Sequence, residues 1–260
     1  MKNGLLDVVF ASEKRKNVLL LLKDGKKSME TFLEVLDTTR QALLPQIKIL
    51  EEHHLLSHHD HCYELTPIGK LLIEDMSLLV STIGVFDQAE EYWGTHNIDF
   101  IPPHLLKRLR DLKEYRIISP SVTELYSIHK SFHRDKTTQS IYKVTNFLYP
   151  DHKAIFTELI DANVTFYYIV SKELLGKIRA QHAEDFRNYI LSGHFNLYVC
   201  NRDIDFLFFT FDDYHIIINL FSKDGRVDSK YVLCSTRDAL EWGKELYEHY
   251  LKESAPVRDI

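Results

Sequence analysis

The apolar positions in residues 1–66 predict three helices followed by a two-stranded ribbon. Ser12 and Ser28 are suitable N-caps, and each stands just before a segment with helical apolar spacing. The third segment carries Leu43, Ile47 and Leu50 at spacings of four and three, as in a helix with one buried side. The inward positions expected in the first two helices are Val18, Leu19, Leu22, Phe32, Leu33 and Leu36.

Proline and strand alternation suggest the limits of the third helix and of the ribbon. Pro45 lacks a backbone N–H and is tolerated in the first turn of a helix, so we predict a start near Gln41. Leu55-Leu56 and Tyr63-Glu64-Leu65 are short alternating pieces. They flank the polar segment Ser57–Cys62, which we predict to be the loop of a wing.

A longer amphipathic helix is predicted from Pro67 onward. Its apolar positions lie 4, 4, 3, 4 and 3 residues apart, which is close to a heptad pattern. Such a stripe is longer than a small domain needs, so we expect it to bury against the remaining chain or against a second copy. The stripe consists of Ile68, Leu72, Met76, Leu79, Ile83 and Phe86.

Beyond residues 97–103, where the composition changes and Pro102-Pro103 interrupts any helix, helical patterns alternate with β-rich runs. This alternation predicts an α/β domain with a mixed sheet, closed by antiparallel hairpins. The helices are expected at Pro103–Leu112, Thr123–His133, His152–Asp161, Lys172–Leu191 and Arg237–Lys252. The strands are expected at Arg116–Ile118, Ser140–Thr145, Thr165–Val170, Asn196–Cys200, Phe206–Phe211, His215–Phe221 and Lys230–Leu233.

The composition is that of an ordinary, weakly acidic globular protein. The chain has 260 residues, of which 45% are hydrophobic, and its net charge is −6. The acidity lies outside residues 1–70, where ten Lys and Arg balance ten Asp and Glu and five His are present. A neutral N-terminal domain can bind DNA if its cations share one side, but charge alone does not establish such binding.

Neither a membrane span nor a disulfide framework is expected. The longest apolar runs are too short to cross a bilayer. Asp7 interrupts the apolar start of the chain and the basic cluster Lys14–Lys16 follows it, so we expect no signal peptide. The three cysteines are widely spaced and odd in number, which favours a reducing cytoplasm.

The first 66 residues have the layout that places one helix in the major groove of DNA. With Ile47 inward, the outward positions of the third helix are Glu52 and three of the candidates below, Gln41, Pro45 and Lys48. Gln41 or Gln46 is suited to reading adenine, Arg40 to a guanine or a phosphate, and Lys48 to a phosphate. The candidate DNA-binding residues of this helix and its N-terminus are Thr38, Thr39, Arg40, Gln41, Pro45, Gln46 and Lys48. The alternative is a packing module whose polar residues are merely solvated.

Several segments resemble the ArsR-like winged-helix regulators of methanogenic archaea, in which a winged helix is fused to a C-terminal regulatory domain. The resemblance rests on Ala42–Glu52, Leu55-Leu56, Tyr63–Gly69, Ile101–Leu106, Asp224-Gly225 and Ala239–Tyr250. It implies a dimeric archaeal repressor or activator that senses a signal connected with methanogenic growth. One departure is His53-His54, which stands where many winged helices carry a glycine.

A histidine cluster falls in the predicted wing. Seven potential metal ligands occur within ten residues, namely His53, His54, His58, His59, Asp60, His61 and Cys62. One hypothesis is a metal switch that uses His58, His59, His61 and Cys62. The interpretation we favour is a wing tip that touches DNA phosphates through His58, His59 and His61, and a solvated wing with no role stays open. Because no CxxC or second ligand set accompanies the cluster, no metal or other cofactor is predicted.

The C-terminal domain carries none of the common enzymatic motifs GxGxxG, GxxxxGK[ST], GxSxG and HExxH. The resemblance implies a C-terminal domain with a layout like that of phospholipase-D-like folds. The chemistry of those folds needs His-x-Lys followed by Asp, and His129-Lys130, His133-Arg134-Asp135 and His152-Lys153 all fail this spacing. We therefore predict that the chain is not an enzyme. Candidate residues for binding an anionic effector are Arg116, His129, His133, Arg134, Tyr142 and Lys143. The interpretation we favour for these residues is that they are solvated or structural groups.

Together these patterns predict a homodimeric, sequence-specific regulator of transcription that binds double-stranded DNA and senses a small molecule, with an α+β or α/β fold. The expected parts are a winged helix-turn-helix at residues 1–66, a linker or dimerisation helix at 67–96 and a regulatory domain at 97–260. The alternatives are a metal-responsive derepressor that uses the wing histidines, an enzyme with an accessory winged helix, and an adaptor that binds only proteins.

Overall fold

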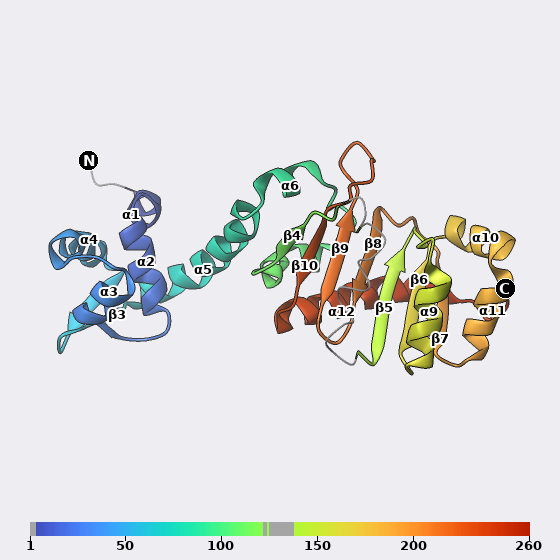
Figure 1. Cartoon of the computed structure of the whole chain (residues 1–260). Helices are drawn as coiled ribbons and strands as arrows, with labels where there is room; N and C mark the ends of the chain where they lie inside the picture. Colours follow the sequence, from blue (N-terminus) through green and yellow to red (C-terminus); the bar gives the residue numbers. More distant parts are fainter. Residues whose placement is uncertain (1–3, 122–123, 125–137) are drawn as a thin grey trace. The chain divides into compact units, whose positions relative to one another are not determined.

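The chain is divided into two compact units. The computed structural model describes residues 4–121, 124 and 138–260, and its two units are residues 1–81 and 82–260 (Figure 1). Helix α5 (Pro67–Asp87) spans the division between them. None of the described helices combines the length and the apolar character that a membrane span requires. The three-part division at residues 66 and 96 stays a prediction.

The first unit has the arrangement of a winged helix-turn-helix, as the sequence predicts. Three helices, α2 to α4, precede a β-ribbon whose strand β3 also pairs with the short strand β1 in the order β1-β3-β2. The elements are α1 (Leu5–Phe10), α2 (Glu13–Leu22), β1 (Lys27–Ser28), α3 (Met29–Val35), α4 (Arg40–Glu52), β2 (Leu56–His59) and β3 (Cys62–Leu65).

N-caps and one-sided burial explain where these helices form. The hydroxyls of Ser12, Ser28 and Thr39 each accept a hydrogen bond from the backbone N–H three residues later. The apolar side of α4 is completely buried in the core of the unit, together with residues of α1, α2 and α3. The predicted caps at Ser12 and Ser28 are therefore confirmed.

Two local details differ from the sequence prediction. Helix α4 begins at Arg40, so Pro45 lies beyond the first turn. The proline cannot donate to the carbonyl of Gln41, and the helix tolerates this because both residues are exposed to water. The predicted loop Ser57–Cys62 is wrong in length, because the strands continue until a tight turn at Asp60-His61, where both residues have positive φ.

The second unit is built on an eight-stranded sheet with the order β11-β7-β6-β5-β8-β9-β10-β4. Strands β5, β6 and β7 are parallel, and the other pairings are antiparallel, which confirms the predicted mixed sheet. The strands are β4 (Arg116–Ile118), β5 (Ser140–Thr145), β6 (Thr165–Val170), β7 (Phe195–Cys200), β8 (Phe206–Phe211), β9 (Ile216–Leu220), β10 (Tyr231–Cys234) and β11 (Ser254–Pro256).

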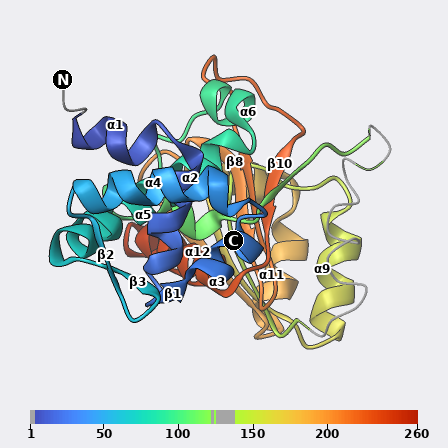
Figure 2. The same cartoon turned by 90° about the vertical axis from the view of Figure 1, so that its left-hand side faces the viewer.

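Helices cover both faces of this sheet. The helices are α6 (Glu90–Thr95), α7 (Pro103–Leu106), the 3₁₀ helix η1 (Leu109–Leu112), α9 (His152–Asp161), α10 (Lys172–Gln181), α11 (Ala183–Leu191) and α12 (Arg237–Lys252). Helix α12 lies on one face and α9 on the other (Figures 1 and 2). The fully buried Trp242 anchors α12, and its indole N–H donates to the carbonyl of Leu105 at 3.0 Å.

Of the helices predicted in the second unit, two are each divided into two shorter helices and one lies mostly outside the described residues. The expected helix Pro103–Leu112 consists of α7 and η1, and Lys172–Leu191 is broken at His182 into α10 and α11. The expected helix Thr123–His133 lies outside the described residues apart from Glu124. Strand β11 was not predicted, because three residues that contain a proline give no recognisable alternation.

Gly69 of α5 allows close packing of that helix on the first unit. A Cβ atom added there would overlap the backbone carbonyl oxygen of Leu55 and lie 3.2 Å from Cδ2 of Leu65. We expect Gly69→Ala to lower the free energy of unfolding of the first unit by roughly 1–3 kcal/mol, because the backbone oxygen cannot move aside cheaply. Urea titration monitored by circular dichroism measures this change.

Gly84 of the same helix gives the matched control. A Cβ atom there meets nothing within 4 Å, so Gly84→Ala should stabilise the helix by about 0.5–1 kcal/mol. Equal effects of the two substitutions would contradict the close approach at Gly69.

Candidate nucleic-acid interface and effector cavity

Helix α4 presents a polar side to solvent while its apolar side is buried. Gln41, Pro45, Lys48 and Glu52 are exposed, at the outward positions that the sequence predicts. Arg40 and Thr39, at the start of the helix, are also exposed, and Thr38 is half-buried. The N-terminus of a 13-residue helix carries free backbone N–H groups and the positive end of the helix dipole, which together attract phosphate.

Gln46 is held within the first unit instead of pointing freely outward. Its Oε1 accepts a hydrogen bond from Nη1 of Arg15 at 2.7 Å. The guanidinium of Arg15, a residue only 9% exposed, also donates to the backbone carbonyls of Val8 and Asp7. Gln46 thus helps to join α4 to α1 and α2. This role is not predictable from the sequence, because Arg15 stands within the basic cluster Lys14–Lys16, which is typical of a solvated surface.

The wing carries its histidines at the end of the ribbon. His58, His59 and His61 are exposed, and the imidazole of His58 stacks on the ring of Tyr63 at 4.3 Å between centroids. His54 adopts a positive φ of 56°, so it takes up the left-handed conformation for which a glycine is usual before a wing. Among the described residues, three metal-ligand atoms converge at one place only, and this place is in the second unit rather than at the wing.

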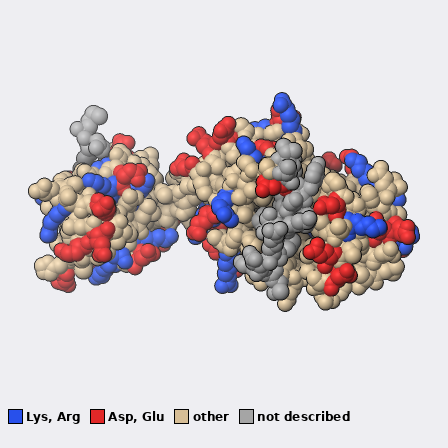
Figure 3. Space-filling model, viewed as in Figure 1, with Lys and Arg blue, Asp and Glu red and all other residues tan. Residues whose placement is uncertain are grey.

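Charges of both signs are interspersed on the face of the first unit that is visible in Figure 3. This agrees with the neutral balance of residues 1–70. An overall positive charge that would attract DNA is therefore absent from this unit, and binding of a polyanion there would require a local arrangement of cations.

The effector candidates of the second unit are not brought together. Tyr142 and Lys143 are neighbours on β5, and the alternation of a strand sends their side chains to opposite faces of the sheet. Tyr142 stacks between Tyr167 and Phe211, at 4.7 and 4.5 Å, on the side of α12. Arg116 is exposed at the start of the edge strand β4. The other candidates, His129, His133 and Arg134, lie outside the described residues.

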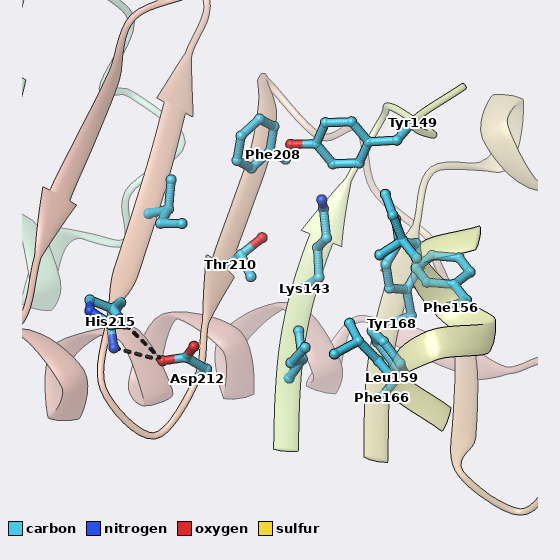
Figure 4. Close-up of a pocket in the computed structure, with 13 residues that line it drawn as sticks. Lys143, Tyr149, Phe156, Leu159, Phe166, Tyr168, Phe208, Thr210, Asp212 and His215 are labelled. Atoms are coloured by element: carbon cyan, nitrogen blue, oxygen red, sulfur yellow. Dashed lines mark hydrogen bonds and ion pairs between the residues drawn. The ribbon is translucent and has the colours of Figure 1, made fainter. Parts of the chain in front are cut away.

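Lys143 points into a cavity of about 70 Å³ on the opposite face, beside α9 (Figure 4). Its cross-strand neighbours Tyr168 and Thr210 face the same cavity, as does Ile217, the partner of Thr210 on β9. The remaining walls are mainly aromatic and aliphatic side chains, including Tyr149 and several residues of α9. The cavity has room for a few water-sized groups.

The ammonium group of Lys143 is surrounded by aromatic rings. Nζ lies 4.6 Å from the ring centroids of both Tyr149 and Phe208, and 5.9 Å from that of Tyr168. Burial lowers the pKa of Lys143 to about 7, because the charged form loses its hydration. No carboxylate offsets this loss within the described part of the chain.

Other polar groups line the same cavity. The hydroxyls of Tyr168 and Thr210 are buried and have no hydrogen-bond partner among the described atoms. Asp212 stands at one end of the cavity, where its Oδ1 accepts from the backbone N–H groups of Tyr214 and His215. A buried cation beside unpaired hydroxyls and apolar walls is suited to an anion with a small apolar body.

Two family models match this sequence. Residues 4–84 match the N-terminal domain of the methanogenesis regulatory protein FilR1, and residues 125–253 match its middle domain. A curated relative is the methanogenesis regulatory protein FilR1 of Methanothrix harundinacea (strain 6Ac), which is 25% identical over 256 residues. The alignment covers 95% of this chain and 56% of the relative, so the chain spans about half the relative's length.

Two solved structures show partial similarity. One is TrmBL2, described as an archaeal chromatin protein with a novel mode of DNA binding, with a TM-score of 0.44 and 13% identity over 96% of this chain and 97% of that one. The other is Nuc from Salmonella typhimurium, a phospholipase D family member, with a TM-score of 0.40 and 15% identity over 56% of this chain and 100% of that one. TM-scores below 0.5 say nothing about function.

The family matches confirm the resemblance to regulators of methanogens, while the specific likeness to ArsR proteins stays a prediction. The matched segments are the N-terminal and middle domains of one protein, and together they cover most of the sequence. By these two domains, the chain belongs to the family of the methanogenesis regulatory protein FilR1.

Proposed function

We propose that this chain is a homodimeric regulator that binds double-stranded DNA through α4 and binds a small anionic effector in its second unit. The observation that carries the proposal is the exposed polar side of α4 opposite a fully buried apolar side. Membership of a family named for the regulation of methanogenesis supports a regulatory role.

In the proposed complex, α4 lies in the major groove. Arg40 and Lys48 are exposed cations on the helix, and they contact phosphate or guanine. Gln41 is exposed near the N-terminus of the helix and contacts a base edge. Gln46 is less suited to this contact, because its side chain is hydrogen-bonded to Arg15. The histidines of the wing tip lie at a backbone phosphate.

The proposed dimer forms through the apolar surface of α1 and the first part of α5. On α5, Ile73 and Met76 are buried in the first unit, but other apolar side chains of this helix are exposed. Leu71 is 66% exposed and Leu79 is 50% exposed, while Leu6 of α1 is 76% exposed. Leu79 also lines a groove of about 450 Å³ between α1 and α5 that is almost wholly apolar. A second copy removes this surface from water.

The proposed effector binds at Lys143. A small carboxylate fits the cavity because its charge pairs with the ammonium group and its apolar body faces the aromatic and aliphatic walls. Binding shifts the population of conformations in the second unit, and α5, which is shared by both units, transmits the shift to the DNA-binding heads. Two heads must keep a spacing that matches the helical repeat of DNA, so a small change in separation costs affinity.

We expect Arg40→Ala combined with Lys48→Ala to weaken binding to duplex DNA by roughly 10- to 100-fold at low salt, because two phosphate contacts are lost. The slope of log affinity against log salt concentration should fall by about 2. Fluorescence anisotropy with a labelled fragment, selected from random DNA by the purified protein, measures both quantities.

Lys16→Ala is the control, because it also removes one positive charge from the first unit. In the wild type, Nζ of Lys16 already pairs with Oε2 of Glu13 at 2.7 Å. This substitution should leave the affinity and the salt slope nearly unchanged. If the double variant of α4 binds DNA as the wild type does, α4 is not the reading helix and the DNA-binding proposal is wrong.

We expect Leu79→Glu to convert the dimer into a monomer, because a carboxylate then has to be buried in an apolar interface. Sedimentation equilibrium should give twice the chain mass for the wild type and the single mass for this variant at micromolar concentration. Leu191→Glu in α11 is the matched control, since Leu191 is 76% exposed and lies outside the proposed surface. A monomeric wild type, or a dimeric Leu79→Glu, contradicts the proposed interface.

We expect the chain to bind butyrate, used as a probe, more tightly at pH 6 than at pH 8. Butyrate is ionised at both values, but the pKa of about 7 leaves Lys143 mostly protonated only at the lower one. The affinity for butyrate should therefore fall about tenfold from pH 6 to pH 8, because the protonated fraction of Lys143 falls by about the same factor. Isothermal titration calorimetry measures the affinities.

Lys143→Met keeps the length of the side chain and removes its charge, so it should abolish butyrate binding at both pH values. Lys177→Met, at a lysine of α10 that is 62% exposed, should leave binding unchanged. Butyrate binding that survives in Lys143→Met, or that does not change with pH, would remove Lys143 from the effector site.

A further inference from the structure

Three potential metal ligands converge in the second unit, and none of them belongs to the elements of the DNA-binding proposal. His152 is the first residue of α9, His182 separates α10 from α11, and Asp185 lies in the first turn of α11. One ligand atom from each of these side chains lies within 4.8 Å of the other two. Two imidazoles and a carboxylate form a ligand set that suits zinc and neighbouring divalent metals.

The hydrogen bonds of His152 leave one ring nitrogen available to a metal. Its Nδ1 lies 3.0 Å from the carbonyl oxygen of Tyr149, and a carbonyl only accepts, so Nδ1 carries the proton. In the neutral ring, Nε2 then has a free lone pair. The side chain is 5% exposed, and Nε2 has no hydrogen-bond partner among the described atoms.

In metal-binding histidines, the ring nitrogen that does not bind the metal usually donates a hydrogen bond, often to a backbone carbonyl. This hydrogen bond fixes the orientation and the tautomer of the ring. A buried ring nitrogen without a partner is otherwise costly.

The other two ligands are placed to complete the site. The rings of His152 and His182 meet edge to face, with 4.6 Å between their centroids. Oδ1 of Asp185 accepts from Nζ of Lys153 at 2.7 Å, but Lys153 is 70% exposed, so this ion pair is weak and can yield. Ligand atoms on a tetrahedral zinc ion lie about 3.4 Å apart. Atoms that now lie within 4.8 Å of one another therefore have to approach by at most about 1.4 Å, which small rotations of two side chains supply.

A groove on the surface of the second unit leads to this cluster. His152 and His182 both line a groove of about 310 Å³ beside α10. With three protein ligands, two of which line this groove, a fourth coordination position is left for water or for a small ligand, as in zinc sites that are not purely structural.

We propose that His152, His182 and Asp185 bind a divalent transition metal, with zinc as the best match and with one coordination position open to the groove. This site uses none of the wing histidines and does not depend on the proposed DNA binding. It is connected to the Lys143 cavity through Tyr149, whose carbonyl orients His152 and whose ring lies 4.6 Å from Nζ of Lys143.

The test uses the full chain, freed of metal by dialysis against a chelator, and measures its affinity for zinc by competition with a chromophoric chelator. Cobalt(II) serves as a spectroscopic probe, since four-coordinate cobalt absorbs strongly in the visible range. We expect one zinc ion per chain. His182→Ala and Asp185→Asn, at partly exposed positions where folding is least at risk, should each weaken zinc binding at least tenfold.

Lys153→Gln should raise the affinity for zinc, whereas the two ligand substitutions lower it. Removing the cation that competes for Asp185 should tighten zinc binding severalfold, which a loss of folding cannot imitate. His104→Ala, at an exposed histidine of the same unit, is the matched control and should change nothing.

Three results would overturn the proposal. The first is a wild type that binds neither zinc nor cobalt at micromolar concentration. The second is unchanged binding in both His182→Ala and Asp185→Asn. The third is binding that disappears when His58, His59 and His61 are all changed to Ala, since the metal would then be held at the wing.

Discussion

Burial of one apolar side of each element is the constraint on which both units depend. On α4, Leu43, Ile47 and Leu50 are completely buried, and this leaves only one orientation for the helix. Its polar side is exposed as a consequence, without any contact that holds it there. The same core contains residues of α1 and α5, so the surface proposed for DNA and that proposed for the dimer rest on one packed cluster.

The sheet of the second unit obeys the same constraint, with a period of two instead of 3.6. Both faces of β5 are covered, so each of its side chains must enter one of two cores. Tyr142 joins an aromatic stack beneath α12, whereas Lys143 has to enter the other core, where nothing neutralises it among the described residues. A fold that bears this cost of desolvation is expected to use the cation for binding.

Some of the buried polar atoms that have no hydrogen-bond partner among the described atoms lie at the two candidate sites of the second unit. The hydroxyls of Tyr168 and Thr210 mark the effector cavity, and Nε2 of His152 marks the proposed metal site. Tyr149 contributes to both places, through its ring and through its carbonyl. A ligand at one of these proposed sites would therefore influence the other through a residue that contacts both.

The sequence by itself determined the elements and their inward sides, because apolar periodicity and N-caps are local properties. It predicted the exposed side of α4 and the mixed sheet, and it named Lys143. It did not show that Arg15 would hold Gln46, and it missed the cluster of His152, His182 and Asp185. The tertiary structure alone decided these, because residues about 30 positions apart in sequence meet only when the helices pack on the sheet.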